Sequence, residues 1–148
     1  MADSIRETIL QEVVSRLEAT AGISGRVYRS RAEMVARGEM PALIVKPLVE
    51  TPVQVTSACK VDKNLQVAVL VCVHNDIPDQ VADPIIADLH KRLMPTAAGF
   101  VDHTLGGLPG VQDVAEAGIT FGIEGFDGVM GLTYDIKYRH TVGDQSVV

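Results

Sequence analysis

The sequence contains no tryptophan, and only 4% of its 148 residues are aromatic although 47% are apolar. A core built from these residues must therefore consist mainly of valine, isoleucine, leucine and alanine. A chain of this length is typical of one domain, here residues 1–148, and can bury about 68–70% of its unfolded surface without stabilising disulfides or metals. Composition alone thus predicts a single domain with an aliphatic core.

Cysteine is also scarce, with only Cys59 and Cys72 present. Two cysteines are too few for a disulfide framework, and these two do not form a CxxC pair. Because each lies among alternating apolar residues, we expect both to be buried as small hydrophobic side chains.

Long apolar segments and basic clusters are absent as well. No run approaches the roughly 18 residues that a membrane-spanning helix needs, and the beginning of the chain lacks the basic and apolar regions of a signal peptide. We therefore expect a soluble protein with no membrane partner, which stays in the compartment where it is made. The formal charge of −6 would repel a DNA backbone, so no specific nucleic-acid binding is expected.

An amphipathic helix is predicted near the start of the chain. Ser4 and Glu7 fit a capping box, and Gly22 is a plausible residue to end the helix. Apolar residues recur at helical spacing on one side; they are Ile5, Ile9, Leu10, Val13, Val14 and Leu17.

A second helix is predicted from about Gln80 to Met94, with an apolar side of its own. Asp83 and Pro84 offer an alternative start, because an acidic cap followed by proline suits a first helical turn. The glycine- and proline-rich segment 95–110 that follows is predicted to be a loop.

The segment Leu65–His74 has the strongest strand pattern, and we expect it at the centre of a sheet. One face is apolar throughout and predicts core; its residues are Leu65, Val67, Val69, Val71 and Val73. The other face is only moderately polar and could be covered by a partner; its residues are Gln66, Ala68, Leu70, Cys72 and His74.

Other strands are expected at 25–29, 42–48, 111–121 and 131–141. Pro47 would mark an edge, a bulge or the end of its strand, since proline cannot donate to a ladder. Residues 51–60 alternate and predict a projecting hairpin arm, with its turn at Glu50–Pro52 or, as we favour, at Asp62–Asn64. The resulting order α, β, β, β, β, α, β, β predicts an α+β two-layer sandwich, in which both helices pack on one face of a mixed or antiparallel sheet.

Few residues suggest chemistry. Asp79, Asp83 and His90 would share a face of a continuous helix and could ligate a metal, but they flank the apolar stripe, where a solvated helix normally carries charge. The glycines match no dinucleotide- or phosphate-binding pattern, and no nucleophile elbow occurs. We therefore expect no enzyme, no metal and no cofactor.

The segment 131–140, GLTYDIKYRH, crowds reactive side chains together. Strand geometry separates them, because alternate residues point to opposite faces. One set predicts a core face: Leu132, Tyr134, Ile136, Tyr138 and His140. The other set, Asp135, Lys137 and Arg139, forms a charged row, which is either solvent surface or a subunit interface. A catalytic cluster would need both kinds of group in one pocket.

Several strings resemble the tail terminator proteins of long-tailed bacteriophages and prophages, the minor tail protein U-like family. They are IRETILQEVVSRL, VYRSR, MPALIVKP, LQVAVLVCVH, VADPIIADLHKRLM and the closing GLTYDIKYRHTVGD. Together they extend from Ile5 to Asp144 as loose patterns rather than a signature. The resemblance implies a protein without cofactor or catalysis, assembled in the bacterial host cytoplasm and located in the virion tail.

The resemblance further implies a hexameric ring that caps the tail tube, ends tail polymerisation and offers the surface to which the head joins. Its partners would be further copies of itself, the tail tube protein and the head–tail connector proteins, and the chain could be monomeric in dilute solution. The alternatives are another connector of the neck or, in a different class, a small α+β enzyme or ligand-binding domain.

No motif of the family fixes its contact residues in this chain. We expect the charges of Asp135, Lys137 and Arg139 to contact a neighbouring subunit or the tail tube. Arg29 and Arg31, in the string YRSR, are predicted to contact an acidic partner.

Overall fold

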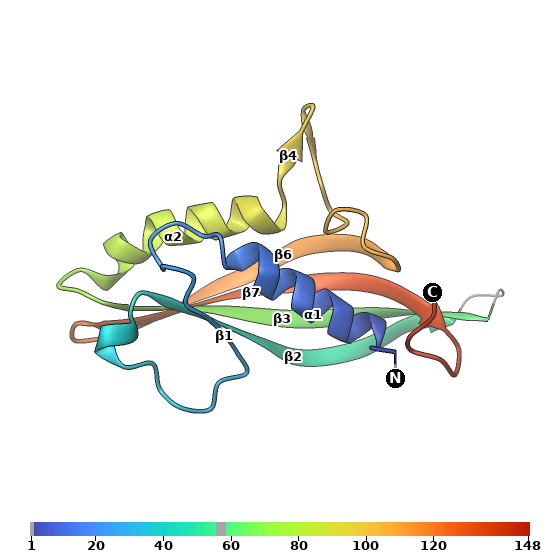
Figure 1. Cartoon of the computed structure of the whole chain (residues 1–148), viewed down its shortest axis with the longest axis horizontal. Helices are drawn as coiled ribbons and strands as arrows, with labels where there is room; N and C mark the ends of the chain where they lie inside the picture. Colours follow the sequence, from blue (N-terminus) through green and yellow to red (C-terminus); the bar gives the residue numbers. More distant parts are fainter. Residues whose placement is uncertain (1, 56–58) are drawn as a thin grey trace.

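The computed structural model describes residues 2–55 and 59–148. Two long helices, α1 (Ile5–Leu17) and α2 (Pro78–Leu93), lie on one face of a sheet, as Figure 1 shows. The strands are β1 (Val27–Arg29), β2 (Ala42–Val55), β3 (Lys60–His74), β6 (Val111–Glu124) and β7 (Asp127–Thr141), and a second, small sheet contains β4 (Thr96–Ala97) and β5 (Phe100–Val101). A short 3-10 helix, η1, spans Arg37–Glu39.

The large sheet has the strand order β1-β2-β3-β7-β6. Strand β1 runs parallel to β2, and every other pair in this sheet is antiparallel. The predicted α+β two-layer sandwich with a mixed sheet is therefore confirmed. None of the helices in the described part of the chain is long and apolar enough to cross a membrane.

The core lies between the helices and the sheet, where the sequence patterns placed it. The predicted apolar faces of α1, β3 and β7 supply most of it, and both Tyr134 and Tyr138 are almost fully buried there. Strand β3 is central, as expected, because two strands lie on either side of it. The alternation in segments 65–74 and 131–140 thus gives the correct face for each side chain.

The opposite side of the sheet, which we call the outer face, carries the other residues of β3 and β7. Its moderately polar β3 residues are partly covered by the chain itself, because the segment 30–41 folds across them. Val35 packs there against Ala42, Ile44 and Cys72. Part of the surface that could have required a partner is therefore covered internally.

Strand β2 contradicts the predicted break after Leu48 and the separate hairpin arm. It continues to Val55 and pairs with β3, so neither of the two predicted turn positions is a turn; the connection lies between Val55 and Lys60. The ladder shifts register beside Pro47 and again beside Pro52. Because β1 pairs only with Leu43–Val45, the edge beyond is free, and prolines without an N–H group are tolerated there.

The helix boundaries also differ from the predictions. Helix α1 ends at Leu17, before Gly22. Its N-terminus has half of the capping box: the Ser4 hydroxyl accepts from the Glu7 amide, whereas the Glu7 carboxylate binds Arg29 instead of reaching back. Helix α2 begins at Pro78 and includes Pro84, so the alternative start at Asp83 is wrong.

One of the two cysteines and the glycine-rich segment 95–110 also differ from the predictions. Cys72 is buried as predicted, but Cys59 is exposed, because it lies in the connection between β2 and β3 rather than within a strand. The segment predicted to be a plain loop contains the β4–β5 hairpin, and the last two strands extend further than expected until they meet at Gly125–Phe126.

Candidate interaction surfaces

The charged row of β7 lies on the outer face, opposite the helices. Its neighbours across the ladder in β3 are Gln66 for Asp135, Asn64 for Lys137 and Asp62 for Arg139. The Gln66 amide donates to the Asp135 carboxylate at 3.3 Å. The structure therefore brings the three predicted residues together in one line on the surface.

Arg139 is engaged within its own chain. Its guanidinium donates from Nε and Nη2 to the two carboxylate oxygens of Asp62, at 2.6 and 3.0 Å. This two-pronged ion pair holds the pKa of Asp62 below its usual value. Lys137 is exposed, and no ion pair to it is formed by the described residues. Of the row, Lys137 is the residue most available to a neighbour.

Arg29 lies in the edge strand β1 and Arg31 just after it, and both are also paired internally. Arg29 donates to both carboxylate oxygens of Glu7 at 2.5 and 2.6 Å, which lowers the pKa of Glu7 to about 2. Arg31 pairs with Glu39 at 2.8 Å and lies over the Tyr28 ring, 4.5 Å from its centre. The five predicted contact residues therefore do not form one site.

The helical trio that could have held a metal is not assembled into a site. Asp79 and Asp83 are exposed on α2, whereas the His90 Nδ1 forms a hydrogen bond with the Tyr134 hydroxyl at 3.1 Å. Within residues 2–55 and 59–148, no three histidine, cysteine or acidic side chains are close enough to share an ion.

A groove at the C-terminal ends of the two helices is lined by three basic residues, Arg16, Lys91 and Arg92. Much of this charge is neutralised locally. Arg16 donates to Glu12 at 2.9 Å, and Arg92 donates to Asp88 at 3.0 Å, each within its own helix. Exposed pairs of this kind hold little net charge for a further partner.

The β4–β5 hairpin (residues 96–101) is a feature that the sequence patterns missed. It turns through Ala98 and Gly99, both with positive φ, which suits a tight two-residue turn. Figure 1 shows it projecting beyond the end of α2, on the helix side of the sheet. Phe100 is 79% exposed, although phenylalanine normally contributes to a core. The dipeptide Ala98-Gly99 was the only local signal for it.

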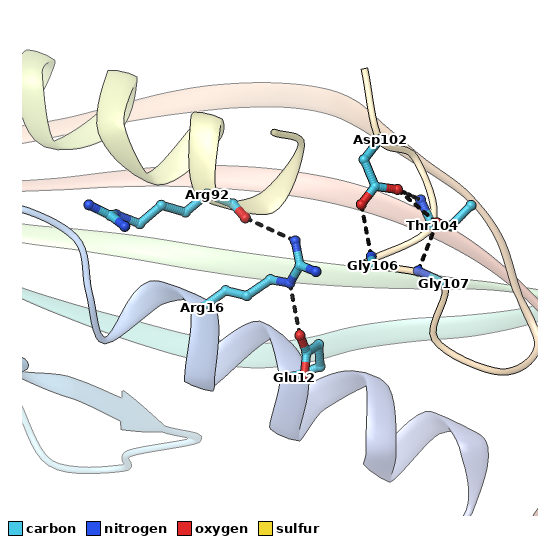
Figure 2. Close-up of polar contacts among 7 residues, drawn as sticks. All are labelled: Glu12, Arg16, Arg92, Asp102, Thr104, Gly106 and Gly107. Atoms are coloured by element: carbon cyan, nitrogen blue, oxygen red, sulfur yellow. Dashed lines mark hydrogen bonds and ion pairs between the residues drawn. The ribbon is translucent and has the colours of Figure 1, made fainter. Parts of the chain in front are cut away.

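One hydrogen bond closes the base of this hairpin, and a dense set of hydrogen bonds orders the turn that follows it (Figure 2). The Asp102 amide donates to the Pro95 carbonyl at 2.8 Å, closing the base. The Asp102 carboxylate accepts from the Thr104 amide at 2.8 Å, the Thr104 hydroxyl at 2.7 Å and the Gly106 amide at 2.8 Å. These donors hold the pKa of Asp102 below its usual value, the Thr104 side chain contributing most.

Helix α1 is joined to α2 next to the same base. Arg16 donates from Nη1 to the Arg92 carbonyl at 3.3 Å, while its Nε binds Glu12, as Figure 2 shows. The hairpin follows α2 directly, so its position is set by the helix layer. The exposed Phe100 thus projects from a hairpin whose base is hydrogen-bonded.

The outer face has an apolar groove of about 160 Å³ where the segment 30–41 meets the sheet. Met34 and Met40 line it from that segment, Ile44 and Leu70 from β2 and β3, and Val129 from β7. Met34 is 91% exposed. No sequence pattern pointed to this groove, because it depends on how a segment without regular structure folds back over the sheet.

No family model matches this sequence, and no curated protein matches it. Among solved structures, the chain is similar to a chain of a structure described as "Virion of native gene transfer agent (GTA) particle". The TM-score is 0.56 at 11% sequence identity, and the match covers 86% of this chain and 91% of that chain. The likeness is one of fold. It extends over most of both chains.

Proposed function

We propose that this chain is a structural protein of a phage or phage-like virion, without catalytic activity. The observation that carries the proposal is the fold that it shares, over most of both chains, with a chain of a virion particle. The resemblance of its sequence to tail terminator proteins refines the role. In this role the chain forms a hexameric ring that caps the tail tube, ends tail polymerisation and provides the surface for head joining.

The surfaces described above suit an assembling subunit. A ring needs two different contact surfaces on each copy, because a head-to-tail contact repeats around a closed circle. The outer face offers the charged row of β7 and an apolar groove to which β7 contributes Val129. The helix side offers the β4–β5 hairpin. Tail tube protein and head–tail connectors would then meet the two open ends of the ring.

The oligomeric state tests this role directly. We expect light scattering over a wide range of protein concentrations to show a monomer that assembles into particles of about six subunits, and negative-stain images to show rings. Purified tail tubes should bind the protein at their ends. A protein that stays monomeric at every concentration and does not bind tail tubes would contradict the proposal. Binding to the portal side alone would favour another neck connector.

A charge reversal tests whether the β7 row is part of the contact. Lys137→Glu should weaken ring assembly while the monomer stays folded, because it reverses the one charge of the row for which the described residues form no ion pair or side-chain hydrogen bond. Lys46→Glu is the matched control, since Lys46 is an exposed lysine on the same face of a different strand, β2. Equal assembly of both variants would identify the row as plain solvent surface.

A further inference from the structure

The β4–β5 hairpin presents an apolar side chain that the described residues leave largely exposed. Phe100 is 79% exposed and Val101 is 46% exposed, and the ladder of the small sheet contains only these two strands. The bond from the Asp102 amide to the Pro95 carbonyl and the pairing of Thr96 with Val101 form the hairpin within the single chain, before any partner arrives. A pre-organised apolar tip loses little conformational entropy on docking.

The outer groove has the size and the chemistry to receive such a tip. Its volume of about 160 Å³ is close to that of an apolar protein cavity of about 150 Å³ that binds benzene. Met34 and Met40 provide flexible, polarisable walls, which adapt to an aromatic ring. A phenyl group that leaves water for this groove gains hydrophobic stabilisation without burying an unpaired polar group.

The tip and the groove lie on opposite sides of the molecule. Figure 1 shows the hairpin rising on the helix side, whereas segment 30–41, which forms one wall of the groove, hangs beneath the sheet. A copy therefore cannot fill its own groove. Two copies that dock in this way use different surfaces, which is a heterologous contact, and such contacts produce rings when the rotation closes.

We propose that Phe100 of one copy inserts into the outer groove lined by Met34, Leu70 and Val129 of the next copy. The inference rests on the proposed ring and names the contact that would hold it. Val129 lies on the outer face of β7, the same strand and face as Lys137. Because Lys137 is eight residues further along β7, an interface that includes both would have the apolar insertion at one end and the charged row at the other.

Paired substitutions test the insertion. Phe100→Ser removes the tip, and Met34→Glu places a charge on the wall of the groove; both residues are so exposed that the monomer should remain folded. Each should lower the association constant, measured by sedimentation velocity, at least about tenfold, because central aromatic contacts dominate interfaces. Phe121→Ser is the matched control, since Phe121 is another exposed phenylalanine, on the edge strand β6. It should change association less than about threefold.

Cross-linking gives a positive readout of the same contact. In a Cys59→Ser, Cys72→Ala background, which removes the exposed native thiol and the one that lines the groove, a Phe100→Cys chain is mixed with a Met34→Cys chain and oxidised. We expect covalent dimers that contain one chain of each kind. A mixture of Phe121→Cys and Met34→Cys chains should give few, because Phe121 is not part of the proposed contact.

The outcomes separate this inference from the ring itself. If the unmodified protein forms rings and Phe100→Ser does so equally well, the insertion is wrong while the ring stands. If only Phe121→Ser prevents assembly, the contact passes through the free edge of β6 instead. If Phe100→Ser forms rings but no longer binds tail tubes, the hairpin docks on the tube protein, which also overturns the insertion. An unmodified protein that never assembles contradicts the ring.

Discussion

Single residues of this chain neutralise each other's charge before any partner is present, and Glu7 with Arg29 is the clearest case. The pair lowers the pKa of Glu7 from 4.5 to about 2. Because the folded pKa lies below the unfolded one, the stabilisation is complete above about pH 4.5 and is lost as the pH falls toward 2. Side chains of this exposure contribute at most about 1 kcal/mol after solvent screening.

Glu7→Gln should therefore lower the free energy of unfolding by up to about 1 kcal/mol at pH 7 and by almost nothing at pH 2. Urea titrations at several pH values measure this difference. Glu18→Gln removes a carboxylate from the end of the same helix, away from Arg29, and corrects for the change in net charge. A difference that stays constant between pH 7 and pH 2 would contradict the ion-pair explanation.

Two glycines near the end of the 102–110 segment share a left-handed backbone conformation, but only one of them would clash with a neighbour if it carried a side chain. Gly107 and Gly110 both have positive φ, 78° and 86°. Among the described residues, a Cβ at Gly107 would meet nothing within 4 Å, whereas one at Gly110 would lie 2.7 Å from the Arg139 carbonyl oxygen. The Gly110 carbonyl also accepts a hydrogen bond from the Arg139 amide at 2.8 Å, so the backbone there has little freedom to move.

We expect Gly107→Ala to cost about 1–2 kcal/mol, the strain of a left-handed conformation. Gly110→Ala should cost clearly more, ~3 kcal/mol or above, because the backbone of β7 must also shift. Equilibrium unfolding of the two variants measures both values under identical conditions. Equal losses would mean that the contact with Arg139 relaxes without cost.

At the scale of secondary-structure elements, α2 contains an internal proline that its packing overrides. Pro84 is exposed and cannot donate to the Gln80 carbonyl, a loss that costs about 3 kcal/mol relative to alanine in a helix interior. The helix continues because Ile85, Leu89 and Leu93 all enter the core. Burial of this apolar side outweighs the missing hydrogen bond.

Pro84→Ala should consequently stabilise the protein by roughly 1–3 kcal/mol, since it restores a helical hydrogen bond at an exposed position. Pro78→Ala is the informative comparison, because Pro78 stands at the start of the helix, where proline is favourable, and is buried. It should destabilise. Thermal unfolding of both variants shows whether each substitution stabilises or destabilises the protein. A destabilised Pro84→Ala variant would show that contacts of the proline side chain contribute more than the restored backbone hydrogen bond.

The same elements show what the sequence can predict. The helical stripe of α1 and the alternation of β3 and β7 predict both faces of the sheet correctly, because burial on one side imposes a period on the residues. Pro47 is predicted to mark an edge, a bulge or a strand end, and the register shift at the edge of β2 confirms the first two. The predicted strand end near Leu48 and both predicted turns are wrong, since whether a strand continues past proline depends on whether its edge is free. That property belongs to the assembled sheet, and no local pattern carries it.

The candidate contact surfaces also differ in how far the sequence predicts them. The row of Asp135, Lys137 and Arg139 follows from strand period alone, although its internal pairing with Asp62 and Gln66 required the register of β3 against β7. The outer groove unites Met34 and Val129, which are far apart in the sequence. Only the fold of segment 30–41 across the sheet brings them together.

At the scale of the whole molecule, net charge opposes assembly and apolar contact favours it. Each copy carries a formal charge of −6, so neighbouring copies repel each other until salt screens them. Screening shortens the range of these forces from about 10 Å at 0.1 M ionic strength to about 3 Å at 1 M. An apolar insertion of Phe100 is not weakened by salt, whereas contacts of an exposed charged row are.

Raising NaCl from about 0.1 M to about 1 M should therefore leave the association of the unmodified protein unchanged or strengthen it. The defect of Lys137→Glu should shrink over this range, because its charge is screened, while the defect of Phe100→Ser should persist. Sedimentation velocity of the three proteins at both salt concentrations measures these responses together. If high salt instead dissociates the unmodified protein and removes the difference between it and Lys137→Glu, the β7 row and not the hairpin supplies most of the binding energy.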